Sequence, residues 1–326
     1  MLPPLAYLQI LLELEIIKIM NEIKIFAPAT IANVSCGFDV LGLALDTVGD
    51  EMIIRKVKQK GVRITKIIGQ DLPLETHNNV AGVAALALLA ETASEFGFEI
   101  EIDKRIKPGS GIGSSAASSA GAVWAINELL GKPFSNLDLV RFAMEGERLA
   151  TGVAHADNVA PALFGGFTLV RSYEPLDIVS IHTPNELFAT VIHPQIEVKT
   201  SDARNILKTT VPLKDAIKQW GNVGGLISGL YTEDYELIGR SFEDYIIEPI
   251  RSILIPAFDA VKKQSLRAGA LGCGISGSGP SIFALCKGEE SALKVAEAMK
   301  LVYNKVGIDY DIHVSKVNKK GIKIIN

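Results

Sequence analysis

The chain alternates between short runs rich in Val and Ile and longer runs dense in Ala and Leu. Short β-branched runs bounded by polar turn residues are typical of strands, because branched side chains pack well on a pleated surface. We therefore predict strands at Ile23–Phe26, Glu51–Val57, Val62–Ile68, Phe98–Ile102, Phe167–Arg171, Ile178–His182, Leu187–His193 and Tyr310–Lys316. A further Gly-rich β segment is expected over Ala270–Cys286.

The longer runs predict helices, several of which end at glycine. They are Asn79–Phe96, a helix that begins at the serines Ser114 and Ser115 and runs to Leu130, Ser135 to about Thr151, Asp215–Ser228, Tyr235–Tyr245, Ile255–Ala268 and Glu289–Lys305. Ser135 precedes Asp138 by three residues, which indicates a capping box. This mixture predicts an α+β fold. We expect a boundary between residues 22–195 and residues 196–326.

Composition narrows the class of protein. The chain has 326 residues, of which 48% are hydrophobic, and 33 basic residues stand against 37 acidic ones. A large core is therefore expected, and nothing favours a nucleic-acid or anionic-membrane partner. The widely spaced Cys36, Cys273 and Cys286 indicate free thiols in a cytoplasmic protein rather than a disulfide framework or zinc site.

The first residues form a separate segment. Residues 1–20 are apolar but are interrupted by Glu13, Glu15 and Lys18, and they offer no cleavage site typical of a signal peptide. The run is also too short and too charged to span a bilayer well. Met20 is an alternative start just before the first strand. We interpret residues 1–21 as an extension of doubtful status.

A glycine-rich segment that begins at Pro108 has the strongest chemical pattern. Alternate glycines let the backbone approach a bulky anion, and the helix that follows points unpaired N–H groups at it. The phosphate loop so predicted comprises Pro108, Gly109, Ser110, Gly111, Ile112, Gly113, Ser114, Ser115, Ala116, Ala117 and Ser118. It lacks the lysine of a Walker A loop. The alternative is a Gly/Ser turn before an ordinary buried helix.

Two further segments carry polar residues among small ones. Asn33 and Asp39 lie in a loop where they could meet a small polar ligand, or could instead bond their own backbone as Asx turns. Glu147 lies near a helix end, where a carboxylate is disfavoured without a partner. A Mg²⁺ ion would be one such partner. The alternative is an exposed Glu147 paired with Arg148 or Arg141.

Two loops complete the candidates. His155, Asp157 and Asn158 lie in a segment with few apolar neighbours at helical spacing, which makes a core histidine less favoured. The stretch Gly272–Gly277 matches G-x-G-x-x-G, but a proline and β-prone residues follow it instead of a helix. We therefore reject a dinucleotide site and a dehydrogenase, and expect a tight turn near a ligand-bearing loop.

Taken in order, these motifs resemble the GHMP kinase superfamily from Ile23 to the C-terminus. The segments Ala27–Gly42 and His155–Gly166 are similar to the homoserine kinase family within it. The resemblance implies two α+β domains, the first with a left-handed βαβ unit carrying the phosphate loop and the second smaller. It also implies a homodimer that phosphorylates L-homoserine with ATP and Mg²⁺ in threonine biosynthesis, and a second glycine-rich segment that buttresses the loop.

The same resemblance implies roles for individual residues. Mg²⁺ would be held by Ser115 and Glu147, with Ser114 the less favoured hydroxyl, and Asn158 would orient the acceptor hydroxyl unless Asp157 faces it instead. The implied homoserine contacts are Asn33, Asp39, Asn158, Arg204 and Arg251, with His155 and Thr200 adjacent. Asn79 and Lys104 are candidates for adenine. The alternatives are a mevalonate- or sugar-type GHMP kinase, or a non-catalytic relative that binds a metabolite.

Overall fold

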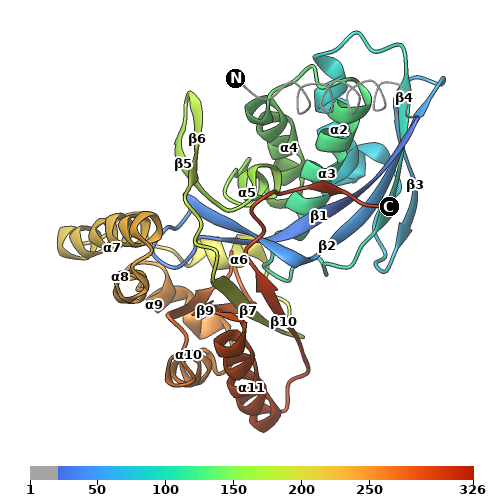
Figure 1. The fold of residues 1–326 in the computed structure, drawn as a ribbon. Coiled ribbons are helices and arrows are strands. Elements are labelled where there is room, and N and C mark those ends of the chain that lie inside the picture. The colour runs from blue at the N-terminus through green and yellow to red at the C-terminus, as the bar shows by residue number, and fades with distance from the viewer. Residues whose placement is uncertain (1–20) are drawn as a thin grey trace, which may run out of the picture.

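The computed structural model describes residues 21–326, and the expected extension at residues 1–20 lies outside the described residues. Two sheets organise the described chain (Figure 1). The first has the strand order β11-β1-β2-β4-β3, with β5 pairing β2 and β6 pairing β5. The second has the order β10-β7-β9-β8.

The strands have the following bounds. They are β1 (Glu22–Ala32), β2 (Leu41–Val57), β3 (Val62–Ile68), β4 (Gly97–Asp103), β5 (Phe167–Tyr173), β6 (Leu176–Ile181), β7 (Leu187–Pro194), β8 (Gly272–Ile275), β9 (Ile282–Lys287), β10 (Tyr310–Lys316) and β11 (Lys323–Ile324). Only β3 and β4 run parallel among the pairs within residues 21–326.

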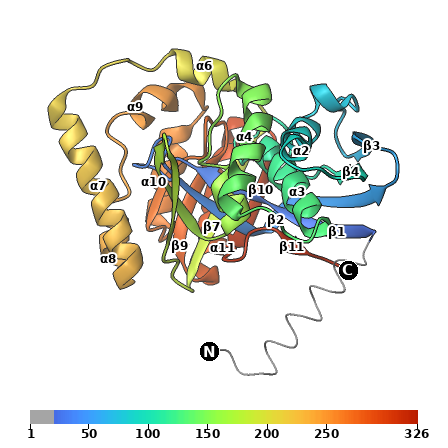
Figure 2. The same ribbon diagram turned by 90° about the horizontal axis from the view of Figure 1, so that it is seen from above.

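The helices divide between the two sheets. They are η1 (Thr76–Asn78), α2 (Val80–Ala90), α3 (Ser114–Leu129), α4 (Asn136–Thr151), α5 (Val159–Phe164), α6 (Thr200–Asn205), α7 (Leu213–Thr232), α8 (Tyr235–Arg240), α9 (Glu248–Arg251), η2 (Ser252–Leu254), α10 (Phe258–Arg267) and α11 (Glu289–Val306). Helices α2, α3 and α4 pack together, and α3 lies on β1 and β2. Helices α10 and α11 pack on the second sheet, and α7 lies on the outer side away from α2–α4 (Figure 2).

The apolar patterns explain these layers. Helix α3 is buried over nearly its whole length because it is composed mainly of Ala and other small residues, which let it approach the sheet closely. Its neighbour α4 begins with the expected capping box between Ser135 and Asp138. The core of the first sheet is continuous with these helices, whereas α10 and α11 enclose a second, smaller core.

Several element boundaries differ from the prediction, and the largest difference is in β2, which begins at Leu41 rather than at Glu51. Strand β1 continues past Phe26 to Ala32, so the segment that holds Asn33 starts at a strand end. Helix α2 ends at Ala90 rather than Phe96, because the apolar run stops there and the Glu91 N–H bonds back to Leu88 and Leu89 in a tightened last turn. Helix α8 ends at Arg240, well before the expected Tyr245.

The division of the chain near residue 195 stays a prediction, and the sheets cross it twice. Strand β7 precedes that position but pairs with β9 and β10 in the second sheet. Strand β11 comes far after it but pairs with β1, where Ile25 faces Ile324. The handedness of the crossover from β3 through α2 to β4 also stays a prediction.

The structure agrees with two further expectations, one for the cysteines and one for the glycine motif at Gly272–Gly277. The thiols of Cys36, Cys273 and Cys286 are buried and free. The stretch Gly272–Gly277 lies at β8 and the turn into antiparallel β9, without the following helix that a dinucleotide site needs. In the part of the chain from residue 21 onward, no helix has the length and apolar character needed to cross a membrane.

Candidate active site

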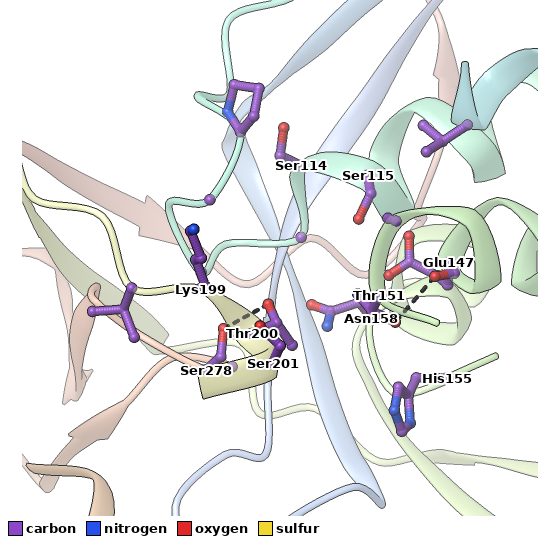
Figure 3. A pocket seen from close by; sticks show the side chains of 18 of the residues that line it. Ser114, Ser115, Glu147, Thr151, His155, Asn158, Lys199, Thr200, Ser201 and Ser278 are labelled. Carbon is purple, nitrogen blue, oxygen red and sulfur yellow. Dashed lines mark hydrogen bonds between the residues drawn. The ribbon is translucent and has the colours of Figure 1, made fainter. Parts of the chain in front are cut away.

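A cavity of about 580 Å³ opens between the phosphate loop and the segments before α5 and at α6. Its lining includes nearly all the polar residues predicted from the sequence, and Figure 3 shows Ser115, Glu147, Asn158 and Thr200 arranged around it. It has two chemically different ends. One end is formed by the phosphate loop and α4, and the other by the residues that follow β1 together with α6 and α9.

The phosphate loop leaves β4 and turns into α3. Gly109, Gly111 and Gly113 have φ values of 73°, 81° and 68°, in the left-handed region that favours glycine. Gly113 is also the N-cap of α3 and supplies no side chain to bond the first N–H groups of that helix. These N–H groups are therefore available to an anion at the positive end of the helix dipole.

The second glycine-rich segment braces the loop from behind. The Ser276 hydroxyl donates to the Gly111 carbonyl at 2.7 Å, and the Ser281 hydroxyl donates to the Ser110 carbonyl at 2.6 Å. A Cβ on Gly111 would lie 2.6 Å from the Gly279 carbonyl oxygen, so only glycine fits there. The loop is thus held by backbone contacts and hydroxyl groups, as the resemblance implies.

Lys104 and Asn79 line the cavity, but their polar groups already have protein partners. The Lys104 amine is buried, pairs with Asp50, and donates to the Ser114 carbonyl at 2.6 Å and the Ser118 hydroxyl at 3.0 Å. Asn79 caps α2, since its Oδ1 accepts from the Ala81 N–H. Its Nδ2 donates to a backbone carbonyl. Polar contacts from these two side chains to adenine therefore gain no support, and that role stays a prediction.

Glu147 lies on α4 with only 5% of its surface exposed. Its Oε1 has no hydrogen-bond partner, and burial raises its pKa to about 7, against the opposing effects of Ser115 and the Lys104 charge. The alternative of a surface ion pair is wrong, because Arg148 pairs with Glu145. Arg141 likewise pairs elsewhere, with Asp138.

A magnesium ion fits this carboxylate. A buried oxygen without a partner lacks the charge neutralisation that a cation supplies, and Ser115 offers a hydroxyl beside it (Figure 3). The Ser114 hydroxyl is instead committed to the Ile106 carbonyl at 2.9 Å. Within residues 21–326 no three His, Cys, Asp or Glu side chains cluster as a metal site, so phosphate oxygens and water would complete the coordination.

The other end of the cavity carries charged side chains. Arg204 donates to both carboxylate oxygens of Asp39, at 3.1 and 2.9 Å, and its Nη2 lies 3.1 Å from His155 Nε2. Arg251 is almost fully buried, and its guanidinium lies 4.9 Å from the centre of the Phe38 ring. Burial lowers the pKa of His155, and the positive charges of Arg204 and Arg251 lower it further against the opposing effect of Asp39.

The sequence leaves two roles open for Asn33 and Asp39, which are contact with a ligand and hydrogen bonding to their own backbone, and the structure favours a different one for each residue. Asn33 bonds backbone at both ends of its amide, since Oδ1 accepts from the Asp39 N–H at 3.0 Å and Nδ2 donates to the Gly277 carbonyl at 2.6 Å. Asn33, Val34, Ser35 and Asp39 all have positive φ. The Asn33 amide thus shapes a strained loop, whereas the Asp39 carboxylate lies in the cavity lining.

Asn158 and Asp157 lie between the two ends. Asn158 Oδ1 accepts a hydrogen bond from the Thr30 hydroxyl at 2.8 Å, and the amide points across the cavity towards Thr200 (Figure 3). The Thr200 hydroxyl is 3.2 Å from that of Ser278. Asp157 is buried in the lining, and burial together with the nearby negative charges raises its pKa to about 7.

Sequence reasoning missed residues that support the site without a motif of their own. Thr30 precedes Asn33 by three positions, and Ser276 and Ser281 flank the glycine turn. Asp50, in the middle of β2, accepts the Lys104 amine and the N–H groups of Arg105 and Ile106 at the start of the loop. The position of Ser276 and Ser281 beside a glycine run is a pattern that could have indicated their role. No pattern in the sequence indicates the role of Asp50.

Comparisons with known proteins agree with this geometry. The model "GHMP kinases N terminal domain" matches residues 78–166, and "GHMP kinases C terminal" matches residues 226–305. A homoserine kinase of Chlorobium phaeobacteroides (strain BS1) is 48% identical over 94% of this chain and 100% of its own length. The crystal structure of homoserine kinase from Cytophaga hutchinsonii is 56% identical, with a TM-score of 0.90 over 94% of this chain and 98% of that one.

The chain belongs to the homoserine kinase family of the GHMP kinases. A homoserine kinase of Methanococcus vannielii, 42% identical over 87% of this chain and 94% of its own length, extends the same likeness. Mevalonate kinase of L. major, at 15% identity and a TM-score of 0.69 over 92% of this chain and 98% of that one, shares the fold alone. The predicted family and its two-domain α+β GHMP kinase fold are thereby confirmed.

Proposed function

We propose that this member of the homoserine kinase family transfers the γ-phosphoryl group of ATP to the hydroxyl of L-homoserine. The products are O-phospho-L-homoserine and ADP, in a step of threonine biosynthesis. The observation that carries the proposal is one cavity with an open helix N-terminus at one end and Asp39, Arg204 and Arg251 at the other. The names of the relatives support it, because homoserine kinases match this chain over nearly its full length.

At the donor end, the loop amides from Gly109 to Ser115 and the start of α3 bind the ATP phosphates. Glu147 and Ser115 hold Mg²⁺, which neutralises negative charge on the phosphates when it is bound. The raised pKa of Glu147 reflects the cost of burying its charge, which Ser115 and the Lys104 charge offset only in part. Phosphoryl transfer asks a protein mainly for positioning and charge neutralisation, and the rigid loop supplies the first of these.

At the acceptor end, the zwitterion of the substrate replaces contacts that the protein makes with itself. The ammonium group pairs with Asp39, and the carboxylate pairs with Arg204 and Arg251 in the planar geometry that arginine favours. The bidentate Asp39–Arg204 pair presents both charges at the right end of the cavity before the substrate binds. Asn33 shapes this loop, with His155 and Thr200 beside it.

Asn158 orients the acceptor hydroxyl towards the phosphate loop. A neutral amide cannot remove a proton, so its contribution is the placement of the attacking oxygen. Asp157 is the alternative group, because it lies in the same lining with a pKa raised to about 7. We assign the hydroxyl to Asn158, whose amide points into the cavity in Figure 3.

The decisive experiment measures ADP release by the purified protein with Mg-ATP and one acceptor at a time. L-homoserine, mevalonate, galactose and shikimate are offered separately, and turnover with homoserine alone is expected. Turnover with mevalonate or a sugar would keep the phosphate loop but contradict the assigned acceptor residues. No turnover with any acceptor would favour a binding protein, although both Glu147 and Ser115 argue for catalysis. Stabilisation by Mg-ATP but not by NAD is the matching binding control.

Two further parts of the proposal concern assembly and location. We expect a homodimer, and the exposed apolar side chains along α7 (Leu213, Ile217, Trp220 and Tyr231) offer a surface for it. Light scattering of the purified protein tests that expectation, and the variant Trp220→Glu tests the surface. The three free thiols support a cytoplasmic protein.

A further inference from the structure

Thr30 is a buried residue of β1 that contacts both the phosphate loop and Asn158. Its backbone N–H donates to the Ile112 carbonyl of the phosphate loop at 3.1 Å. Its hydroxyl donates to Asn158 Oδ1 at 2.8 Å. The pairing of β1 with β2 is irregular between Pro28 and Thr30, and such an irregularity re-aims the side chains that follow it.

Gly113 completes the contact. A Cβ on Gly113 would lie 2.0 Å from the Thr30 hydroxyl oxygen and 3.0 Å from Asn158 Oδ1. The last glycine of the loop, the end of β1 and the residue before α5 therefore meet at one point. Thr30 has no exposed surface, so water does not compete for its hydroxyl.

We propose that Thr30 is the positioning residue that fixes the Asn158 amide relative to the phosphate loop. The Thr30 hydroxyl occupies Oδ1 of Asn158, which leaves the Nδ2 hydrogens to face the acceptor and the transferred phosphoryl group. Asn158 thus acts as a hydrogen-bond donor that positions the oxygen atoms of the acceptor hydroxyl and the phosphoryl group. The inference rests on the function proposed above, because it assumes that Asn158 contacts the acceptor hydroxyl.

The two hydrogen bonds of Thr30 can be tested separately, because one is made by the side chain and the other by the backbone. A side-chain substitution removes the bond to Asn158 but keeps the backbone bond to Ile112, so the loop and its ATP contacts stay in place. We therefore expect the turnover number to change more than the KM for Mg-ATP. A role in stability alone would lower the melting temperature without this split.

The test compares Thr30→Val, which keeps the shape of the side chain, with Thr30→Ser, which keeps the hydroxyl. We expect kcat to fall about tenfold in Thr30→Val, the scale of one lost hydrogen bond, with KM for Mg-ATP within about twofold. Thr30→Ser should restore most of the loss. Wild-type kcat in Thr30→Val, or an equal loss in Thr30→Ser, would overturn the proposal.

Thr190→Val is the matched control. Thr190 is equally buried, and its hydroxyl donates at 2.8 Å to the Ala292 carbonyl, but it lies in the second sheet away from the cavity. The melting temperature of Thr190→Val should fall, whereas its kcat should stay at the wild-type value. In the double variant Thr30→Val/Asn158→Ala, the loss should not exceed that of Asn158→Ala alone, since Thr30 acts through Asn158. Additive losses would contradict this.

The acceptor used is whichever one the wild-type protein phosphorylates. If that acceptor is not homoserine, the proposed substrate fails while the comparison of Thr30 variants still applies. A crystal structure of Thr30→Val gives a readout that needs no turnover. An Asn158 amide in its wild-type position would overturn the inference, and a rotated or disordered amide would support it.

Discussion

The two ends of the cavity are formed by different kinds of chemical group. The donor end is made of backbone N–H groups, glycines and hydroxyls, and its main supports are Ser276, Ser281 and the buried Lys104–Asp50 pair. The acceptor end is made of charged side chains that bond one another, above all Asp39 and Arg204. In the proposed reaction, the donor end keeps these bonds when ATP binds, whereas the acceptor end has to exchange the Asp39–Arg204 ion pair for contacts with substrate.

This difference has a chemical reason. Peptide dipoles bind any phosphate chain without regard to what it is attached to, so rigidity costs the donor end no selectivity. The acceptor end has to distinguish one small molecule from others. Paired charges of both signs disfavour an acceptor that cannot replace each of them, because a charge that the bound acceptor covers without pairing it is costly.

The largest expected effect breaks the donor end. Glu147→Gln should lower kcat/KM by about a thousandfold, the upper scale for losing one charge-stabilising contact. The loss should shrink as Mg²⁺ is raised, and steady-state kinetics at several Mg²⁺ concentrations measure it. Glu145→Gln is the control, because Glu145 is exposed and pairs with Arg148 on the same helix. Similar kinetics in the two variants would contradict a metal role for Glu147.

A substitution at the acceptor end should change KM for homoserine and leave KM for Mg-ATP unaffected. Arg204→Lys removes the bidentate fork and should raise KM for homoserine about a hundredfold, the upper scale for losing a charge-assisted hydrogen bond to the substrate carboxylate. KM for Mg-ATP should stay unchanged. Arg141→Lys, in an exposed pair with Asp138, serves as control. An equal rise in both KM values would show that the two ends are not independent.

Asn158 and Asp157 sharpen the comparison where the two ends meet. Asn158→Ala should lower kcat/KM about thirtyfold, the scale of a hydrogen bond to a charged group, and should do so more than Asp157→Ala. The reason is that Thr30 aims the Asn158 amide, whereas no such contact aims Asp157 at the acceptor. Equal or reversed losses in kcat/KM would transfer the orienting role to Asp157.

The smallest expected effect is on stability. Burial raises the pKa of Asp157 from 3.8 to about 7, so between these values the folded protein keeps a proton that the unfolded chain has lost. This carboxyl therefore costs stability as pH rises towards 7, and the cost is constant above it. Asp157→Asn should raise Tm by about 3 °C at pH 8 and hardly at all at pH 4.5, since about 1 kcal/mol moves Tm by that amount.

Thermal unfolding without nucleotide, followed at both pH values, provides the measurement. Asp71→Asn is the control, because Asp71 is exposed. A gain at pH 8 in both variants would indicate an effect of net charge alone. A fall in Tm for Asp157→Asn at pH 8 would show that the carboxylate is stabilised by the positive charges of Arg204 and Arg251 more than burial penalises it.

The sequence predicted best what depends on neighbouring residues. The capping box of α4, the glycine loop and the absence of a helix after Gly277 are local patterns, and all of them appear in the structure. The predicted end of α2 at Phe96 is wrong, because residues 92–96 contain no glycine or proline that would indicate an earlier end. The G-x-G-x-x-G match at Gly272 is not a dinucleotide site, and the sequence shows this because a proline and β-prone residues follow it instead of a helix.

Contacts between distant segments were not predictable. Nothing in the sequence pairs Asp50 with Lys104 or Thr30 with Asn158, since each pair forms only when β1, β2 and the loop assemble. The buried state of Glu147 depends in the same way on α4 packing beside α3. The family resemblance supplied roles for these positions, but the physical reasons for them come from the assembled fold.

The pairing of β11 with β1 has a consequence for synthesis on the ribosome. The Ile322 N–H donates to the Ala162 carbonyl and the Ile325 N–H to the Lys24 carbonyl, so residues that follow the last strand of the second sheet cover the β1 edge of the first sheet. Until they emerge, β1 keeps an open edge, and open edges invite association with other chains. The edge of the first sheet at β1 therefore stays unpaired on the ribosome until β11 has been synthesised and has emerged.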